Sequence, residues 1–247
     1  MSETSSTTVR ESMRKILSHF GIEKNDCTFS KLSECAREFV KDTITGQRRW
    51  HDNLIRNMIQ TGDSVIDLGC GDGELLARIS TTVRCRVQGI EGDETQVYKC
   101  IERGLPVCHA DILDILPIIP DGSYTWAILE DTVQTLVQPM AVLSQMLRIA
   151  DNCIISFPNF AHWTVRYTFS LGGRMPVTRA LPYTWYNTPN IHLCSITDFL
   201  DWVESEKLVV TASWALVEGK VVPFSLSLNH NITAEQAMFV VKKPRTN

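Results

Sequence analysis

Apolar positions recur with two different periods between residues 64 and 157. Short apolar runs predict buried strands, and the amphipathic stretches of about ten residues between them predict helices. The predicted strands are 64–68, 86–90, 107–110, 124–129 and 152–157. The predicted helices before and between them are 49–59, 74–81, 93–103 and 139–149. Because strands that alternate with such helices form parallel sheets with right-handed crossovers, this region predicts an α/β fold.

The pattern changes after this region. Residues 158–194 show no clear period and are interrupted by Pro and Gly. A helix is then predicted at 197–207, with Ser195 as its capping signal. Two β-rich stretches follow, at 208–217 and 236–242, and we expect the second to pair antiparallel with the parallel strands. The predicted sheet therefore has about seven strands, mainly parallel with one antiparallel strand.

The N-terminal part of the chain is predicted to be separate from this sheet. Residues 1–45 form a helical extension with a partly disordered start, and its helices are expected at 10–20 and 30–41. Residues 46–247 form the α/β domain, in which 156–194 is a lid or insert.

Composition narrows the class of protein. The 247 residues are 44% hydrophobic and 21% charged, close to the averages of soluble globular proteins. The net charge is −4, whereas a nucleic-acid-binding protein is typically basic. Apolar runs are too short to cross a membrane, and the Ser/Thr-rich start lacks the apolar core of a secretory signal. The eight cysteines contain no C-x-x-C pair, so we expect reduced thiols, no metal site and a cytoplasmic location.

The most informative motif is a glycine-rich turn between the first predicted strand and its helix. The run VIDLGCGDGE at 65–74 places Asp67 before Gly69, Cys70, Gly71 and Gly73. Glycine is needed where the backbone takes a positive φ or where a ligand approaches closely. Nicotinamide-type sites use G-x-G-x-x-G, which would require a glycine where Glu74 stands. The G-x-G-x-G spacing after an acid instead resembles the first motif of class I S-adenosylmethionine (SAM) methyltransferases.

This resemblance implies roles for the residues that end the predicted strands. The turn, with Cys70 inside it, would hold the methionine part of SAM or of its demethylated product S-adenosylhomocysteine, since free helix N–H groups suit a carboxylate. Glu91 would accept hydrogen bonds from the ribose hydroxyls. Asp111 would bind the adenine amino group and Ile112 would pack against its ring. Glu130 would close the base of the site.

The residues after the fourth strand also exclude one class of enzyme. Glu130-Asp131-Thr132 stands where amino-methylating enzymes of nucleic acids and protein amides carry Asn/Asp-Pro-Pro-Tyr. A methyltransferase of that type is therefore not expected.

Residues 156–190 combine eight aromatic residues and three arginines with no acid. We take Trp163, Arg166, Arg174, Trp185 and Tyr186 as candidate contacts. The composition fits a lid over an anionic acceptor or a protein interface, where Trp, Tyr and Arg are favoured. The remaining alternative is that residues 156–190 have only a structural role, with the aromatic residues packed and the arginines in solvent.

His162 and His192 are the candidates for a catalytic base. Either one can equally be a hydrogen-bonded structural histidine.

Several segments together resemble the methionine-biosynthesis protein family MetW, over about residues 48–215. Besides the glycine turn, these are WHDN at 50–53, ISFPNF at 155–160, HW at 162–163, GRMPVT at 173–178, LPY at 181–183, WY at 185–186 and TPNIHLC at 188–194. The resemblance implies a class I methyltransferase fold and a role in methionine biosynthesis alongside homoserine O-acyltransferase. The chain departs from the family at Glu130-Asp131-Thr132, where Ser-Gln-Thr is usual.

Two functions remain open at this point. One is a SAM-binding methionine-biosynthesis protein that acts with homoserine O-acyltransferase through the 156–190 segment. The other is an active SAM-dependent methyltransferase on an unidentified, anionic small molecule. We favour the first, because the resemblance implies a pathway role and leaves the methyl acceptor undefined.

Overall fold

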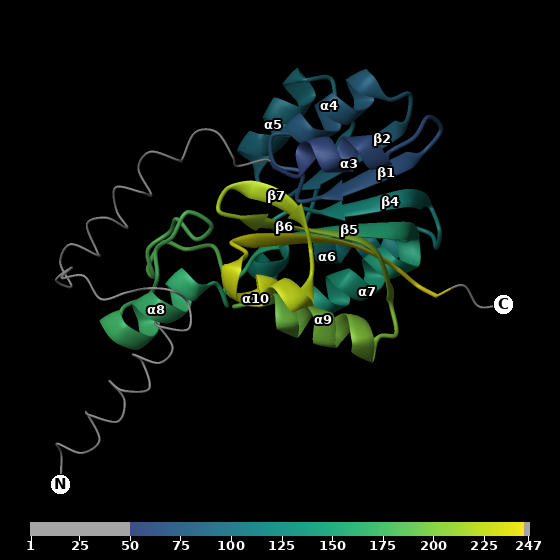
Figure 1. Cartoon of the computed structure of the whole chain (residues 1–247). Coiled ribbons are helices and arrows are strands. Elements are labelled where there is room, and N and C mark those ends of the chain that lie inside the picture. Colours follow the sequence, from purple (N-terminus) through teal and green to yellow (C-terminus); the bar gives the residue numbers. More distant parts are fainter. Residues whose placement is uncertain (1–49, 245–247) are drawn as a thin grey trace, which may run out of the picture. The chain divides into compact units, whose positions relative to one another are not determined.

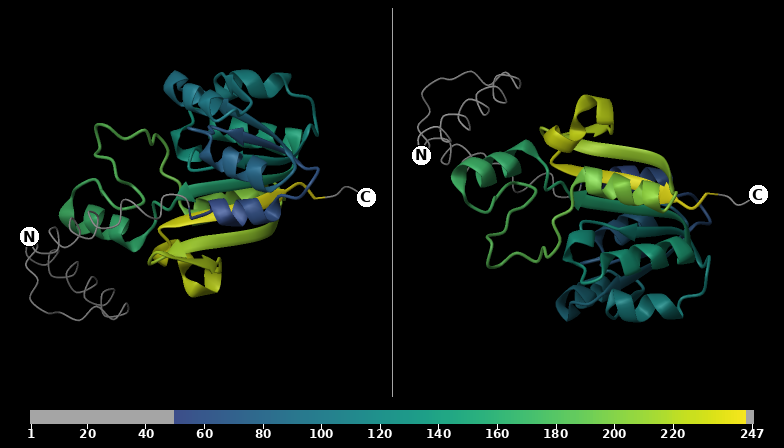
Figure 2. Two further views of the ribbon diagram at one scale, coloured as in Figure 1. Left: turned by 90° about the horizontal axis from the view of Figure 1, so that it is seen from above. Right: turned by 90° about the horizontal axis from the view of Figure 1, so that it is seen from below.

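The computed structural model describes residues 50–244, so the helices predicted at 10–20 and 30–41 lie outside the described residues. An eight-stranded sheet forms the centre, with the strand order β3-β2-β1-β4-β5-β8-β6-β7. Figure 1 shows the sheet with helices on both sides, and Figure 2 shows it from above and below. The α/β class predicted from the apolar pattern is therefore confirmed.

Five parallel strands form one half of the sheet. They are β1 (Ser64–Leu68), β2 (Arg86–Glu91), β3 (Val107–His109), β4 (Tyr124–Leu129) and β5 (Ala150–Pro158). The helices that precede and connect them are α3 (Asp52–Met58), α4 (Glu74–Thr82), α5 (Glu94–Glu102), α6 (Ile112–Ile115) and α7 (Pro139–Ile149). The strand order reverses between β1 and β4, and open α/β sheets bind ligands at such a reversal.

The other half of the sheet is antiparallel. β8 (Gln236–Lys242) pairs with β5 on one side and with β6 (Val209–Val217) on the other. β7 (Lys220–Pro223) folds back onto β6. The sheet therefore has eight strands, whereas the sequence predicted about seven strands of which one was antiparallel. The extra strand follows from a two-residue turn, because Glu218 and Gly219 both have positive φ, of 49° and 73°.

One helix lies inside the segment 158–194, which the sequence predicted to be irregular. It is α8 (Trp163–Gly172); His162 caps its start and Gly173, with φ 57°, ends it. Histidine is an uncommon helix-capping residue, so the sequence carried a clear stop signal but no clear start. The later helices are α9 (Ile196–Ser205) and α10 (His230–Thr233), and the single-turn 3-10 helices are η1 (Leu116–Ile118), η2 (Val133–Thr135) and η3 (Leu226–Leu228).

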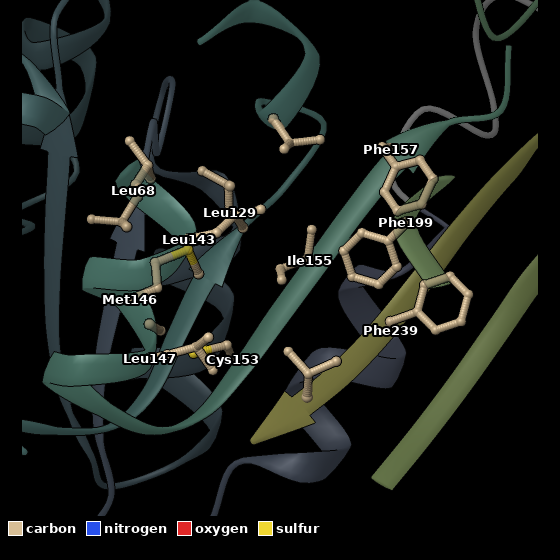
Figure 3. Close-up of a cluster of buried hydrophobic side chains, with 14 of the residues drawn as sticks. Leu68, Leu129, Leu143, Met146, Leu147, Cys153, Ile155, Phe157, Phe199 and Phe239 are labelled. Carbon is tan, nitrogen blue, oxygen red and sulfur yellow. The ribbon is translucent and has the colours of Figure 1, made fainter. Parts of the chain in front are cut away.

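Each face of the sheet carries its own apolar cluster, because successive strand residues point to opposite faces. On β5, Ile155 and Phe157 belong to one cluster and Ile154 to the other. Residues of α7 and α9 cover the first face, where Figure 3 shows Phe157 grouped with Phe199 and Phe239. Residues of α3 and α4 cover the second face.

In the part of the chain that the structure describes, no helix has both the length and the apolar character needed to cross a membrane.

Candidate cofactor site at the carboxyl ends of the parallel strands

The predicted cofactor residues converge at one edge of the sheet. Because β1 to β4 are parallel, their carboxyl ends meet there, and the register places Asp67 opposite Gly89 of β2 and Ile128 of β4. Glu91 ends β2 and pairs with His109 at the end of β3. The turn after β1 and the acids after β2, β3 and β4 therefore lie along the same edge, as the sequence predicted.

All three glycines of the turn have the left-handed backbone that favours glycine. The φ angles of Gly69, Gly71 and Gly73 are 78°, 55° and 72°. The N–H groups of Gly69 and Cys70 donate to the carbonyl of Ile90, at 2.8 and 3.1 Å, which ties the turn to β2.

The three glycines differ in what an added Cβ would meet. At Gly73 it would lie 2.5 Å from a methyl of Leu105 and 2.9 Å from the sulfur of Cys100, so this glycine is required by packing at the start of α4. At Gly69 it would lie 3.1 Å from the side chain of Thr132. At Gly71 there is nothing within 4 Å. Gly71 therefore faces the open side of the turn, where a ligand can approach the backbone.

Glu91, the predicted ribose contact at the end of β2, is hydrogen-bonded to the glycine turn. One carboxylate oxygen accepts from the N–H of Gly71 and the other from the N–H of Asp93, both at 2.8 Å. A carboxylate oxygen has two acceptor sites, so each can accept a further hydroxyl. The side chain is thus held in place before any ligand binds.

The other residues predicted to contact the cofactor differ in how deeply they are buried. Asp67 is buried beneath it. Asp111 is exposed and caps α6, since one of its oxygens accepts from the N–H of Leu113 at 2.7 Å, while Ile112 is buried behind it. Burial, with the nearby charge of Asp67, raises the pKa of Cys70, so its thiol remains protonated. The side chain of Cys70 is buried in an apolar cluster, and a contact of this residue with the cofactor stays a prediction.

A buried charged cluster that the sequence did not predict lies beside Glu130. His51 is fully buried, and its Nδ1 lies 2.9 Å from an oxygen of Glu130 and 3.9 Å from one of Asp52. Its Nε2 lies 3.7 Å from an oxygen of Asp131. The WHDN segment at 50–53 marked these residues in the sequence, but nothing linked them to residues 130–131, which are close only in the folded chain.

The acids around His51 set its charge. Burial by itself lowers the pKa of an imidazole, but here the charge of Glu130 and the contacts with Asp131 and Asp52 outweigh burial and hold the pKa of His51 well above its usual value. Arg78 is the cation next to Asp52, at 3.3 Å, and it also pairs with Glu74.

The two predicted catalytic histidines lie in the 158–194 segment and have structural contacts. His162 caps α8, with Nδ1 2.7 Å from the hydroxyl of Thr164, and burial lowers its pKa to about 4. His192 is exposed, and its backbone N–H donates to the carbonyl of Gln134 at 3.0 Å. These contacts hold the segment in place; a catalytic role for either side chain stays a prediction.

The predicted partner contacts are mostly exposed on the same segment, which Figures 1 and 2 show extending beyond the end of the sheet. Trp163 is 47% exposed, and Trp185 and Tyr186 are 74% and 72% exposed with their rings in edge contact at 5.6 Å. Arg174 is exposed, while the side chain of Arg166 donates to the carbonyl of Ala161 at 2.6 Å.

Comparison with protein families gives a decisive match. Residues 49–241 match the model of the family described as "Methionine biosynthesis protein MetW". The chain belongs to the MetW family. The resemblance inferred from the sequence motifs is confirmed, and with it a role in methionine biosynthesis.

A curated relative of this MetW-family chain is the "Bifunctional methionine biosynthesis protein MetXA/MetW" of Rhodopirellula baltica. It is 31% identical over 219 residues, which are 81% of this chain and 35% of the relative. The chain thus spans about a third of the length of the curated relative that it matches.

Solved structures share the fold at low identity. A SAM-dependent methyltransferase from Archaeoglobus fulgidus superposes with a TM-score of 0.58 and 15% identity, covering 84% of this chain and 99% of that one. The [4+2]-cyclase SpnF superposes with a TM-score of 0.56 and 14% identity, covering 79% and 81%. The class I SAM-methyltransferase fold is therefore shown. The same fold also occurs in SpnF, which is named as a cyclase and not as a methyltransferase.

Proposed function

We propose that this MetW-family protein binds SAM or S-adenosylhomocysteine at the glycine turn. The observation that carries the proposal is the turn itself, with Gly71 open to a ligand and bonded through its N–H to the carboxylate of Glu91. Asp67 and Asp111 lie at the same sheet edge, where the ammonium and adenine ends of the cofactor would be held. The structural neighbour from Archaeoglobus fulgidus is itself a SAM-dependent methyltransferase.

The protein then acts in methionine biosynthesis together with homoserine O-acyltransferase, the enzyme that activates homoserine. The support is the family resemblance and the relative that joins MetXA and MetW in one chain, because fusion of two proteins favours pairs that work together. The exposed aromatic residues of the 158–194 segment offer a surface of the composition that partners bind.

Active methyl transfer is the alternative function. It needs chiefly an aligned donor and acceptor, so few side chains have to take part in the chemistry. The acceptor would be a small, anionic molecule held by the arginines of the 158–194 segment. The shared fold does not decide between the two functions, since a [4+2]-cyclase has it too.

Three measurements on the full chain separate these functions. Calorimetry with SAM and with S-adenosylhomocysteine tests the cofactor site. Co-purification with homoserine O-acyltransferase, and its acyl-transfer rate with and without this chain, tests the partnership. Release of S-adenosylhomocysteine from SAM in the presence of cell-extract metabolites tests methyl transfer. SAM binding with partner capture and no turnover supports the first function; turnover without partner capture supports the alternative, and absence of SAM binding overturns both.

A further inference from the structure

We propose that His51, Asp52 and Glu130 form a binding site for one divalent first-row transition-metal ion such as Mn²⁺ or Zn²⁺. One ring nitrogen of His51, a carboxylate oxygen of Asp52 and one of Glu130 all lie within 4.8 Å of one another. One imidazole with two carboxylates is a donor set that suits these ions. The site joins two segments of the chain, the start of α3 and the end of β4.

The distances between the donor atoms fit an ion of this size. Octahedral ligands about 2.1 Å from an ion lie about 3 Å apart when adjacent and about 4 Å apart when opposite. Nδ1 of His51 lies 2.9 Å from Glu130 and 3.9 Å from Asp52. The two distances from Nδ1 therefore match one adjacent and one opposite pair of octahedral ligands, and all three donors lie within 4.8 Å of one another.

The hydrogen bonding of the two buried residues points to a ligand. Both ring nitrogens of His51 and both carboxylate oxygens of Asp52 are buried and have no aligned hydrogen-bond partner. The oxygen of Glu130 is close to Nδ1 but lies off the direction in which an N–H would point. Buried polar atoms in this condition are rare unless an ion or a ligand completes them.

The surrounding residues complete a metal site. Asp131 lies 3.7 Å from Nε2, the ring nitrogen that would not bind the ion, and metal-binding histidines commonly have a carboxylate on that side. An ion that binds Nδ1 replaces the proton that His51 otherwise carries. The three carboxylates of Asp52, Glu130 and Asp131 then face one cation among the described residues within ion-pair distance, that of Arg78. A divalent ion offsets the two remaining negative charges. The side chain of Glu130 is 18% exposed, which gives solvent a route to the site.

The loop that carries two of these acids is held rigidly. Asp131 has φ 48°, a left-handed backbone that is unusual for this residue, and its N–H donates to the carbonyl and the hydroxyl of Ser156 at 3.1 and 3.0 Å. Thr132, next along the loop, lies against Gly69. The proposed ion is thus adjacent to the cofactor turn, and Glu130, which the resemblance places at the base of the cofactor site, would belong to both sites.

Calorimetry with MnCl₂ and with ZnCl₂ on chelator-stripped full chain tests the site. We expect saturable binding of one ion per chain. Glu130→Gln keeps the size of the side chain but removes its charge, so affinity should fall at least about tenfold. Asp63→Asn is the matched control, because Asp63 is a partly buried carboxylate at the opposite end of β1, and it should bind like the wild type. Absence of saturable binding, or equal affinity in Glu130→Gln, would overturn the proposal.

A second measurement needs no substitution. Pulsed electron paramagnetic resonance of the Mn²⁺-loaded wild type should detect one directly bound nitrogen, that of His51, and a spectrum with oxygen ligands alone would contradict the site. SAM calorimetry repeated with a chelator present separates failure of the ion site from failure of the cofactor site, because the chelator removes the ion and leaves Glu130 in place. SAM affinity should remain measurable without the ion.

Discussion

Glu91 is the residue on which the cofactor assignment depends most directly. Its carboxylate already accepts the N–H groups of Gly71 and Asp93, and it has acceptor capacity left for the two ribose hydroxyls. A single substitution therefore tests both the ribose contact and the anchoring of the turn.

Replacing Glu91 with Ala should weaken SAM binding at least tenfold. Hydrogen bonds to a charged acceptor contribute roughly 1.5–3 kcal/mol each, and about 1.4 kcal/mol is one decade in affinity. Calorimetry measures the affinity, and Glu94→Ala, which removes an exposed acid from the same region, serves as the control. Unchanged affinity in Glu91→Ala would exclude the ribose role.

Gly71→Ala and Gly73→Ala form a matched pair, because both positions have positive φ and both substitutions add one methyl group. At Gly71 the methyl occupies open space, so SAM affinity should fall at least tenfold with a stability loss of about 1–2 kcal/mol from backbone strain. At Gly73 the methyl collides with Leu105 and Cys100, and overpacking should add about 1–3 kcal/mol to the strain. Urea unfolding and SAM calorimetry compare the two; the opposite ranking would mean that Gly71 is a structural glycine.

At the scale of elements, α8 depends on a histidine cap whose protonation state matters. Burial lowers the pKa of His162 to about 4, from 6.5 in an unfolded chain. Between pH 6.5 and pH 4 the unfolded chain binds a proton that the folded chain does not. The contribution of His162 to stability is therefore complete above pH 6.5 and is lost as the pH falls to 4.

His162→Ala should remove this pH dependence. At pH 7.5 the variant should be less stable by about 1 kcal/mol, the usual effect of losing a helix cap. The difference between wild type and variant should shrink between pH 6.5 and pH 4. Urea unfolding at several pH values measures it, and a difference that stays constant with pH would show that His162 does not titrate as the structure indicates.

The exposed aromatic residues of α8 and of the segment after it belong to the proposed partner surface. Trp163→Ala and Trp185→Ala should each weaken the complex with homoserine O-acyltransferase by roughly 2 kcal/mol, as loss of a buried interface anchor does. Because both side chains are exposed in the free chain, unfolding midpoints and SAM affinity should change little. Surface plasmon resonance measures the complex; unchanged affinity in both variants would place the interface elsewhere.

At the scale of the whole molecule, an aromatic cluster packs where the parallel and antiparallel halves of the sheet meet. Phe239 of β8 stacks with Phe157 of β5 and contacts Phe199 of α9 and Phe224, at ring distances of 5.0–6.2 Å. Phe239→Ala should lower the free energy of unfolding by about 3–5 kcal/mol. Val221→Ala on the edge strand β7 should lower it by less than about 1 kcal/mol, since Val221 is 41% exposed. Urea unfolding of both variants checks the contrast, and similar losses would contradict it.

The local pattern of apolar residues by itself determined much of the secondary structure of this protein. Strands β1, β4 and β8 and helix α7 have the bounds that the apolar periods predicted. The three strands are recognisable because each is a short continuous apolar run, and α7 because its buried residues recur with the period of a helix. The glycine turn and the acids at the ends of β1 to β4 could be placed at one edge of the sheet for a related reason. Parallel strands bring their carboxyl ends to a common edge, whatever the details of packing.

Tertiary structure alone decided the features that join distant segments. His51 and Asp52 are separated from Glu130 by nearly eighty residues, so no spacing in the sequence could reveal that they share one buried cluster. The crowding at Gly73 comes from Leu105 and Cys100, which approach the turn only after folding, while nothing approaches Gly71. Helix α8 and strand β7 were missed because their signals, a histidine cap and a Glu-Gly turn, are weak until packing selects them. Short-range periodicity determines which elements form, while contacts between distant residues decide which side chains meet and what they can bind.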